Sequence, residues 1–283
     1  MRTFLDCYPC FLRQAIEAAR MSEATPAQEK DIVLSILEIL QGIEDGATPP
    51  VIGTKVHQLV RDITGNPDPY FQVKKEATEK ALRMVPELQS LLDASEDRLA
   101  TALRLSIAGN IIDFGPNPDY DLWDIVDQVL NEELAIDDTE ILLTRLRDVN
   151  SVLFLADNAG ETVFDRLLIE ELPKPVTYAV RGGAVINDAT MADAIAAGID
   201  QVAEVIDNGS RVPGTILSMC SQGFQEIFNT AELIFSKGMG NYETLSEVHS
   251  PILFLMRVKC HVIAADVGAP TNSAVIKKGI GLS

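Results

Sequence analysis

The stretch Val152-Leu153-Phe154-Leu155-Ala156-Asp157-Asn158-Ala159-Gly160-Glu161 decides the fold of this 283-residue chain. Its first half is short, apolar on both faces and bounded by turn residues, which is typical of a buried parallel strand. Its second half is polar and lies where such a strand would leave the sheet, and open α/β sheets bind ligands at that edge. Asp157 and Asn158 offer adjacent oxygen ligands of the kind that hard cations prefer, while Gly160 permits a tight turn.

A strand followed by a polar turn occurs twice more in the chain. The segment 176–190 (VTYAVRGGAVINDAT) leads into an Asn-Asp pair ahead of a helical segment, and 233–243 (LIFSKGMGNYE) leads into a lysine and a glycine-containing turn. Each turn taken alone is more simply interpreted as a helix cap or a loop. Three such turns at comparable strand ends favour a functional site instead. If the three strands are parallel, one edge of the sheet holds Asp157, Asn158, Asp188 and Lys237. Carboxylates with one lysine suit a divalent cation and a phosphoryl group together.

The three turns, in this order and spacing, resemble the signature blocks of the DUF89 family, the metal-dependent damage-control phosphatases. The further matches are Cys7-Tyr8-Pro9-Cys10, Asp68-Pro69-Tyr70 and Ala108-Gly109-Asn110-Ile111-Ile112-Asp113. The cysteine pair is similar to that of the small prokaryotic branch of the family. The resemblance implies hydrolysis of phosphate monoesters of small metabolites, such as sugar phosphates or damaged phospho-metabolites. It also implies a divalent cation, for which Mn²⁺, Co²⁺, Ni²⁺ and Mg²⁺ are the candidates.

The resemblance implies roles for single residues. The expected metal ligands are Asp157, Asn158 and Asp188, and the expected catalytic residues are Asp157, Asp188 and Lys237. Lys237 would act as a point charge on the phosphoryl oxygens from a solvent-reachable cleft. The expected substrate-binding residues are Asn110, Asp113, Lys237, Gly238, Gly240 and Asn241. Asp157 could instead be a nucleophile that forms an aspartyl-phosphate, as in the haloacid-dehalogenase phosphatases, which use a D-x-D pair; Asp157-Asn158-Ala159 lacks the second aspartate of such a pair, which favours the ligand role.

A binding module is the alternative from a different class. In that interpretation the three turns hold a nucleotide or S-adenosylmethionine in a Rossmann-like protein, either a methyltransferase or a non-catalytic module. Two observations count against it. The first turn offers metal-type ligands rather than a glycine-rich loop, and the chain has neither a P-loop nor a G-x-G-x-x-G motif after the first strand.

The composition restricts the partners. The chain carries 23 Lys and Arg against 42 Asp and Glu, a net charge of −19, so that it repels nucleic acid and anionic membranes. A phosphorylated metabolite would meet the same repulsion unless a bound cation and local basic groups overcome it. No run reaches the ~20 apolar residues of a membrane span, and residues 1–20 carry charges that a signal peptide lacks. We therefore expect a cytoplasmic protein, and the sequence leaves its oligomeric state open.

The cysteines Cys7, Cys10, Cys220 and Cys260 are expected to be reduced in such a protein. Cys7 and Cys10 with Cys260-His261 would make a conceivable four-ligand zinc set. However, residues 261–265 resemble a strand, in which neighbouring side chains point to opposite faces. We therefore favour a structural role for Cys7 and Cys10, with metal binding as the lesser alternative.

The chain changes character near residue 148. Before it, apolar residues at helical spacing predict successive helices, including one over 73–92 that Pro86 should kink or split. After it, helices alternate with strand candidates at 151–156, 176–181, 203–206, 232–236, 251–256 and 261–265. We predict an α/β protein in which a helical N-terminal region, 1–148, packs on a three-layer, Rossmann-like α/β/α domain, 149–283, with a mostly parallel sheet.

Overall fold

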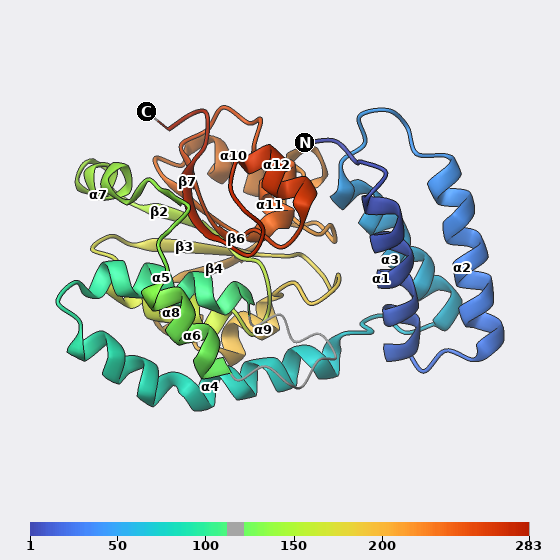
Figure 1. Ribbon diagram of the computed structural model, residues 1–283, viewed down its shortest axis with the longest axis horizontal. Helices are drawn as coiled ribbons and strands as arrows, with labels where there is room; N and C mark the ends of the chain where they lie inside the picture. Colours follow the sequence, from blue (N-terminus) through green and yellow to red (C-terminus); the bar gives the residue numbers. More distant parts are fainter. Residues whose placement is uncertain (112–121, 283) are drawn as a thin grey trace.

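The computed structural model describes residues 1–111 and 122–282, which form a mixed α/β structure around one sheet (Figure 1). The strands are β1 (Ile136–Asp137), β2 (Val152–Leu155), β3 (Val176–Val180), β4 (Glu204–Asp207), β5 (Ile234–Lys237), β6 (Ile252–Arg257) and β7 (Ala274–Lys278). Their order in the sheet is β1-β7-β6-β5-β2-β3-β4. Neighbouring strands are parallel except β6 and β7, which confirms the expected mostly parallel sheet.

Helices cover both faces of this sheet. Their bounds are α1 (Cys7–Met21), α2 (Pro26–Gln41), α3 (Pro49–Thr64), α4 (Phe71–Ala94), α5 (Arg98–Ile111), α6 (Leu122–Asn131), α7 (Thr139–Asp148), α8 (Thr162–Glu171), α9 (Met191–Ala196), α10 (Gln222–Thr230), α11 (Gly238–Leu245) and α12 (His261–Val267). Pro86 was expected to kink or split its helix; α4 continues through it, so the helix is not split. Ala81 and Leu88, on either side of Pro86, are buried in one core, and this packing holds the two halves of the helix together.

The alternation of side chains along the strands divides the core into two layers. Phe154 on β2 and Phe235 on β5 face α5 and α8, whereas Leu153 and Leu155 face α10, α11 and α12. Because both faces are covered, β2 is buried along its whole length, as its uninterrupted apolar sequence predicts. Figure 1 shows α5 and α8 below the sheet and α10 to α12 above it, which confirms the three-layer arrangement.

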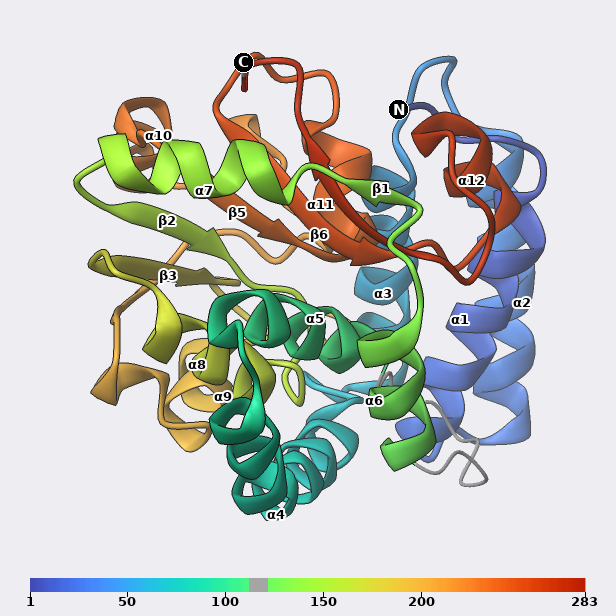
Figure 2. The ribbon, with the colours of Figure 1, turned by 60° about the vertical axis from the view of Figure 1, so that its left-hand side comes forward.

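The N-terminal helices do not form one unit. Helices α1, α2 and α3 share a hydrophobic cluster of their own, and Figure 2 shows them side by side at one end of the molecule. Helices α4 to α7 instead contribute to the cluster that covers the sheet, and β1 pairs with β7 through Ile136 and Val275. The boundary at residue 148 stays a prediction, while the hydrophobic clusters separate α1–α3 from the rest.

One predicted strand is wrong. Residues 261–265 belong to α12, and the strand that completes this part of the sheet is β7, which the sequence pattern did not indicate. A short apolar run fits a buried helix turn as well as a strand. Here Val262, Ile263 and Val267 bury one side of a short helix, and Gly268 at φ 79° ends it. None of the helices in the described residues is long and apolar enough to cross a membrane.

Candidate active site

Parallel pairing brings the three polar turns to one edge of the sheet. Strand β2 lies between β5 and β3, and it is parallel to both. In register, Leu155 on β2 is opposite Ala179 on β3 and Ser236 on β5. The turns that follow these strands therefore leave the sheet at similar heights, and the sequence-based expectation that they share an edge is confirmed.

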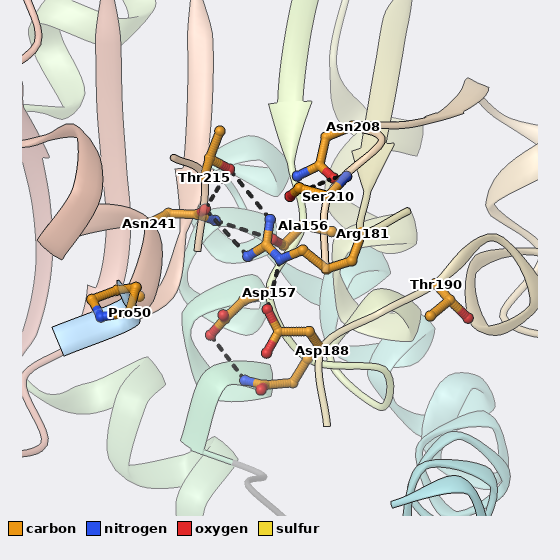
Figure 3. Close-up of polar contacts among 12 residues, drawn as sticks. Pro50, Ala156, Asp157, Arg181, Asp188, Thr190, Asn208, Ser210, Thr215 and Asn241 are labelled. Carbon is orange, nitrogen blue, oxygen red and sulfur yellow. Dashed lines mark hydrogen bonds and ion pairs between the residues drawn. The ribbon is translucent and has the colours of Figure 1, made fainter. Parts of the chain in front are cut away.

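Backbone hydrogen bonds join the first turn to the second. The N–H of Ala189 donates to the carbonyl oxygen of Asp157 at 2.8 Å, and the N–H of Ala159 donates to that of Asn187 at 2.9 Å. Asn158 and Asp188 thus form a small antiparallel bridge beyond the sheet. The bridge places the carboxylates of Asp157 and Asp188 next to each other, as Figure 3 shows.

The carboxylate of Asp157 is held from three sides. Its Oδ2 accepts hydrogen bonds from Nδ2 of Asn110 and Nδ2 of Asn158, each at 2.9 Å. Gly238, at φ 74°, lies so close that a Cβ there would overlap this same oxygen. Burial raises the pKa of Asp157 well above its usual range, and the charge of Glu161 raises it further. A bound cation would relieve this concentration of negative charge.

Arg181, at the end of β3, holds the second carboxylate, and the sequence analysis missed it. Its Nε donates to Oδ2 of Asp188 at 2.7 Å, and its side chain is only 2% exposed. The rest of its guanidinium donates to Thr215 Oγ1 and Asn241 Oδ1, at 3.3 and 3.2 Å (Figure 3). Burial raises the pKa of Asp188, and Arg181 opposes the rise. The signal available in the sequence was an arginine next to the glycine pair of the second turn.

Lys237 does not line a solvent-reachable cleft, contrary to the expectation. Its side chain is 0% exposed, and its Nζ lies 2.5 Å from both Glu161 Oε1 and Asp165 Oδ1. The cause is the alternation of β5, because Lys237 points to the same face as Phe235, toward α5 and α8. Burial opposes the charge of the ammonium group, but Asp165 and Glu161 outweigh this effect and raise the pKa of Lys237.

Glu161 connects this buried lysine to the front of the site. Its Oε2 accepts hydrogen bonds from Nδ2 of Asn110 and from Nδ2 of Asn158, each at 3.0 Å. These are the two amides that hold Asp157. Asp165, on the other side of Lys237, accepts from the hydroxyls of Ser106 and Tyr178. The side chains behind Asp157 therefore form one connected polar network.

A cavity of about 440 Å³ opens in front of the two carboxylates, between the sheet edge and helices α1 and α3. The predicted site residues that line it are Asp157, Asn158, Asp188 and Gly240. Asn110 lies behind Asp157, as described above. Asn241 is buried, with its Nδ2 donating to the carbonyl oxygens of Ala156 and Lys237 at 3.0 and 2.8 Å. Asp113 lies outside the described residues.

The donors at this edge suit a hard divalent cation. Nδ2 of Asn158 is turned toward Asp157 and Glu161, and within the described part of the chain its Oδ1 accepts no hydrogen bond. The available ligands are therefore the carboxylates of Asp157 and Asp188 and one amide oxygen, an all-oxygen set. In residues 1–111 and 122–282, no three His, Cys, Asp or Glu side chains form a ready metal group, so the amide oxygen would be an essential member.

Three cysteines line the same cavity. Cys7 and Cys10 lie in the first turn of α1, and Cys260 immediately precedes α12. All are free thiols, and burial raises the pKa of Cys7, with Cys260 and Cys10 adding to the rise. Cys260 and His261 do not lie on opposite faces of a strand, because His261 begins the helix α12 and Cys260 immediately precedes it. The roles of these cysteines stay predictions.

Comparisons with known proteins point to one family. The family model for the damage-control phosphatase ARMT1-like domain matches residues 3–275. A damage-control phosphatase of Pyrococcus horikoshii is 31% identical, with 97% of each chain covered. One of Archaeoglobus fulgidus is 33% identical, with 96% of this chain and 97% of that protein covered. An uncharacterized protein of Methanocaldococcus jannaschii is 35% identical over 96% of this chain and 94% of its own length.

The fold agrees as well. The crystal structure of a DUF89 family protein from Pyrococcus horikoshii superposes with a TM-score of 0.89 at 29% identity, covering 99% of both chains. These findings confirm the resemblance at the level of the family and favour a phosphatase over the nucleotide- or S-adenosylmethionine-binding alternative. The branch marked by an N-terminal cysteine pair stays a prediction. The chain belongs to the damage-control phosphatase ARMT1-like family.

Proposed function

We propose that this chain hydrolyses phosphate monoesters of small metabolites, with a divalent cation held by Asp157, Asn158 and Asp188. The observation that carries the proposal is the pair of carboxylates, joined by backbone hydrogen bonds, that faces a cavity of about 440 Å³. A cavity of this size suits a small ligand such as a sugar phosphate or a damaged phospho-metabolite. The names of the relatives from Pyrococcus horikoshii and Archaeoglobus fulgidus support this substrate class.

The chain's own residues would act in two groups, one that faces the cavity and one that supports the first from behind. A bound Mn²⁺, Co²⁺, Ni²⁺ or Mg²⁺ ion would supply Lewis-acid polarisation of the phosphoryl oxygens. Asp157, Asn158 and Asp188 would hold the cation, and the hydrogen bond from Arg181 keeps Asp188 oriented toward the cavity. Helix α11 begins beside Asp157, and its residue Gly240 lines the cavity, so the N–H groups of its first turn favour a bound anion.

Lys237 and Asn241 support this arrangement from behind. Lys237 balances Glu161, which accepts from both amides that hold Asp157. Asn241 accepts from Arg181 and donates to the backbone at the ends of β2 and β5. We therefore assign both residues a positioning role, and Asp157, with its Oδ2 held by two amides, the role of a ligand rather than a nucleophile.

Metal removal and replacement test the proposal. The protein should lose hydrolysis of p-nitrophenyl phosphate after EDTA treatment and regain it with one or more of Mn²⁺, Co²⁺, Ni²⁺ and Mg²⁺. Asp157→Ala should weaken metal binding in calorimetry, whereas Asp45→Asn, which changes an exposed carboxylate between α2 and α3, should not. Full activity of the metal-stripped protein would contradict the proposal. A panel of sugar phosphates assayed with the best metal then narrows the substrate.

A further inference from the structure

Three thiols lie where the helices α1 to α3 meet the sheet. Cys7 and Cys10 belong to the first turn of α1, and Cys260 immediately precedes α12, so that two walls of one cavity contribute them. Figure 2 shows α12 at the same end of the molecule as α1. All three are free and only partly buried. The proposed hydrolysis uses none of them, and a group of accessible thiols is suited either to a soft metal ion or to thiol–disulfide chemistry.

The arrangement of the donors does not favour a metal ion. Within residues 1–111 and 122–282, no three His, Cys, Asp or Glu side chains are grouped so that they could hold one. His261, next to Cys260, is exposed, and its Nε2 lies 3.4 Å from an oxygen of Asp6. A disulfide needs two sulfurs and no further ligand, so we examine which two thiols meet.

Packing brings Cys7 and Cys260 together. Both pack, partly buried, against the hydrophobic cluster on the face of the sheet that α10 to α12 cover. The sulfur of Cys10 is engaged on its own helix, where it accepts a hydrogen bond from Nε2 of Gln14 at 3.3 Å. Burial raises the pKa of Cys7, and charge on Cys260 adds more to this rise than charge on Cys10 does. This order is expected when Cys260 is as near to Cys7 as its neighbour one helical turn away.

A bond between these two sulfurs would join parts of the molecule that otherwise pack separately. Cys7 also packs against the cluster that α1, α2 and α3 share among themselves. Cys260 belongs to the sheet, because the N–H of its neighbour Lys259 donates to Sδ of Met239, in the first turn of α11, at 3.3 Å. A disulfide holds its two Cα atoms within about 7 Å of each other. It would therefore fix the separation of the two walls between which a substrate must enter.

We propose that Cys7 and Cys260 form a reversible disulfide that restrains the cavity and lowers the activity of the protein under oxidising conditions. The oxidant is a small-molecule disulfide. The thiolate of Cys260 attacks one of its sulfurs, which gives a mixed disulfide and releases one thiolate. The thiolate of Cys7 then attacks Sγ of Cys260 and releases the second. Both cysteines are oxidised, and the oxidant is reduced to two thiols, which take up the two protons that the cysteines lose.

The test treats the full-length, reduced protein with oxidised glutathione. Mass spectrometry of unreduced peptides should find residues 7 and 260 linked. After desalting, kcat/KM for p-nitrophenyl phosphate with Mn²⁺ should be lower by about 10- to 100-fold, the loss expected when site geometry is displaced by about 1 Å. Dithiothreitol, removed again before the assay, should restore the activity of the parent.

Cys10→Ser is the matched control, since it removes a thiol of the same helix and the same cavity. This variant should still form the disulfide, lose activity and recover. Cys260→Ser and Cys7→Ser should each keep their activity in oxidised glutathione, and they test the bond from its two sides in case one of them does not fold. Thermal unfolding of each reduced variant verifies the fold.

The outcomes separate this inference from the proposed function, on which only the effect on activity rests. A bond between Cys7 and Cys10, a glutathione adduct without a second step, or protection by Cys10→Ser would overturn the pairing. A mapped Cys7–Cys260 bond that leaves kcat/KM within about twofold of the reduced protein would overturn the restraint of the cavity. Because the mapping needs no turnover, it remains decisive if the reduced parent cleaves no phosphate ester, a result that would refute the phosphatase proposal alone.

Discussion

Replacing Lys237 by methionine tests whether this lysine supports the site from inside the core. Its Nζ lies 2.5 Å from an oxygen of Glu161 and of Asp165, and all three side chains are fully buried. Methionine keeps much of the stem but leaves two carboxylates without a counter-charge. Breaking a buried ion pair from one side costs about 3–5 kcal/mol. At about 2–4 °C per kcal/mol, this loss lowers Tm by about 6–20 °C.

The stability that Lys237→Met loses relative to the parent should become smaller as the pH falls. Burial raises the pKa of Asp165 to about 6, and the charge of Lys237 opposes this rise. Without Lys237 the pKa of Asp165 rises further. The folded variant then takes up a proton at pH values where the unfolded chain, with a carboxyl pKa of about 4, does not. Lowering the pH from 8 to 6 therefore stabilises the folded variant more than it stabilises the parent.

Urea unfolding of the parent, Lys237→Met and the control Lys278→Met, which replaces an exposed lysine, at pH 8 and pH 6 measures both effects. The double variant Lys237→Met/Asp165→Asn should recover part of the lost stability, because one of the two unbalanced carboxylates is removed. A loss below about 1 kcal/mol at pH 8, the size expected of an exposed ion pair, would refute the structural reasoning. So would a loss of the same size at both pH values.

Three further predictions concern the site. Gly238→Ala should weaken Mn²⁺ binding at least about tenfold in calorimetry, because the added Cβ would displace the carboxylate of Asp157. Gly268→Ala, which has a similar positive φ but open space around it, should strain the backbone without weakening Mn²⁺ binding, and equal effects of the two variants would refute the steric argument. Arg181→Lys loses the planar fork that joins three partners, so kcat/KM should fall by about 10- to 100-fold, and wild-type kinetics would exclude this positioning role. The Cys7→Ser/Cys10→Ser double variant should stay folded and retain activity within about tenfold, unless stoichiometric zinc is lost together with the fold.

The sequence by itself was sufficient for the class of fold and for the sheet edge at which the three polar turns meet. The run Val152–Leu155 is apolar on both faces, and such a strand is stable only between two layers of helices, which is where β2 lies. Polar turns after three such strands indicated a shared edge, because the carboxyl ends of parallel strands meet there. The pattern of those turns also carried the family resemblance that the comparisons confirm.

The tertiary structure alone decided which side chains face the cavity. Lys237 ends its strand next to the site, yet the alternation of β5 and the packing of α5 and α8 turn it into the core, beside Glu161 and Asp165. Lys259 follows a different strand, and reaches the cavity because β6 lies beside β5 and its chain continues across α11. The local sequence indicates whether a segment is a helix or a strand through the spacing of its apolar residues. Which face of that element is buried, and which charged side chains lie against it, depends on contacts between segments far apart in the chain.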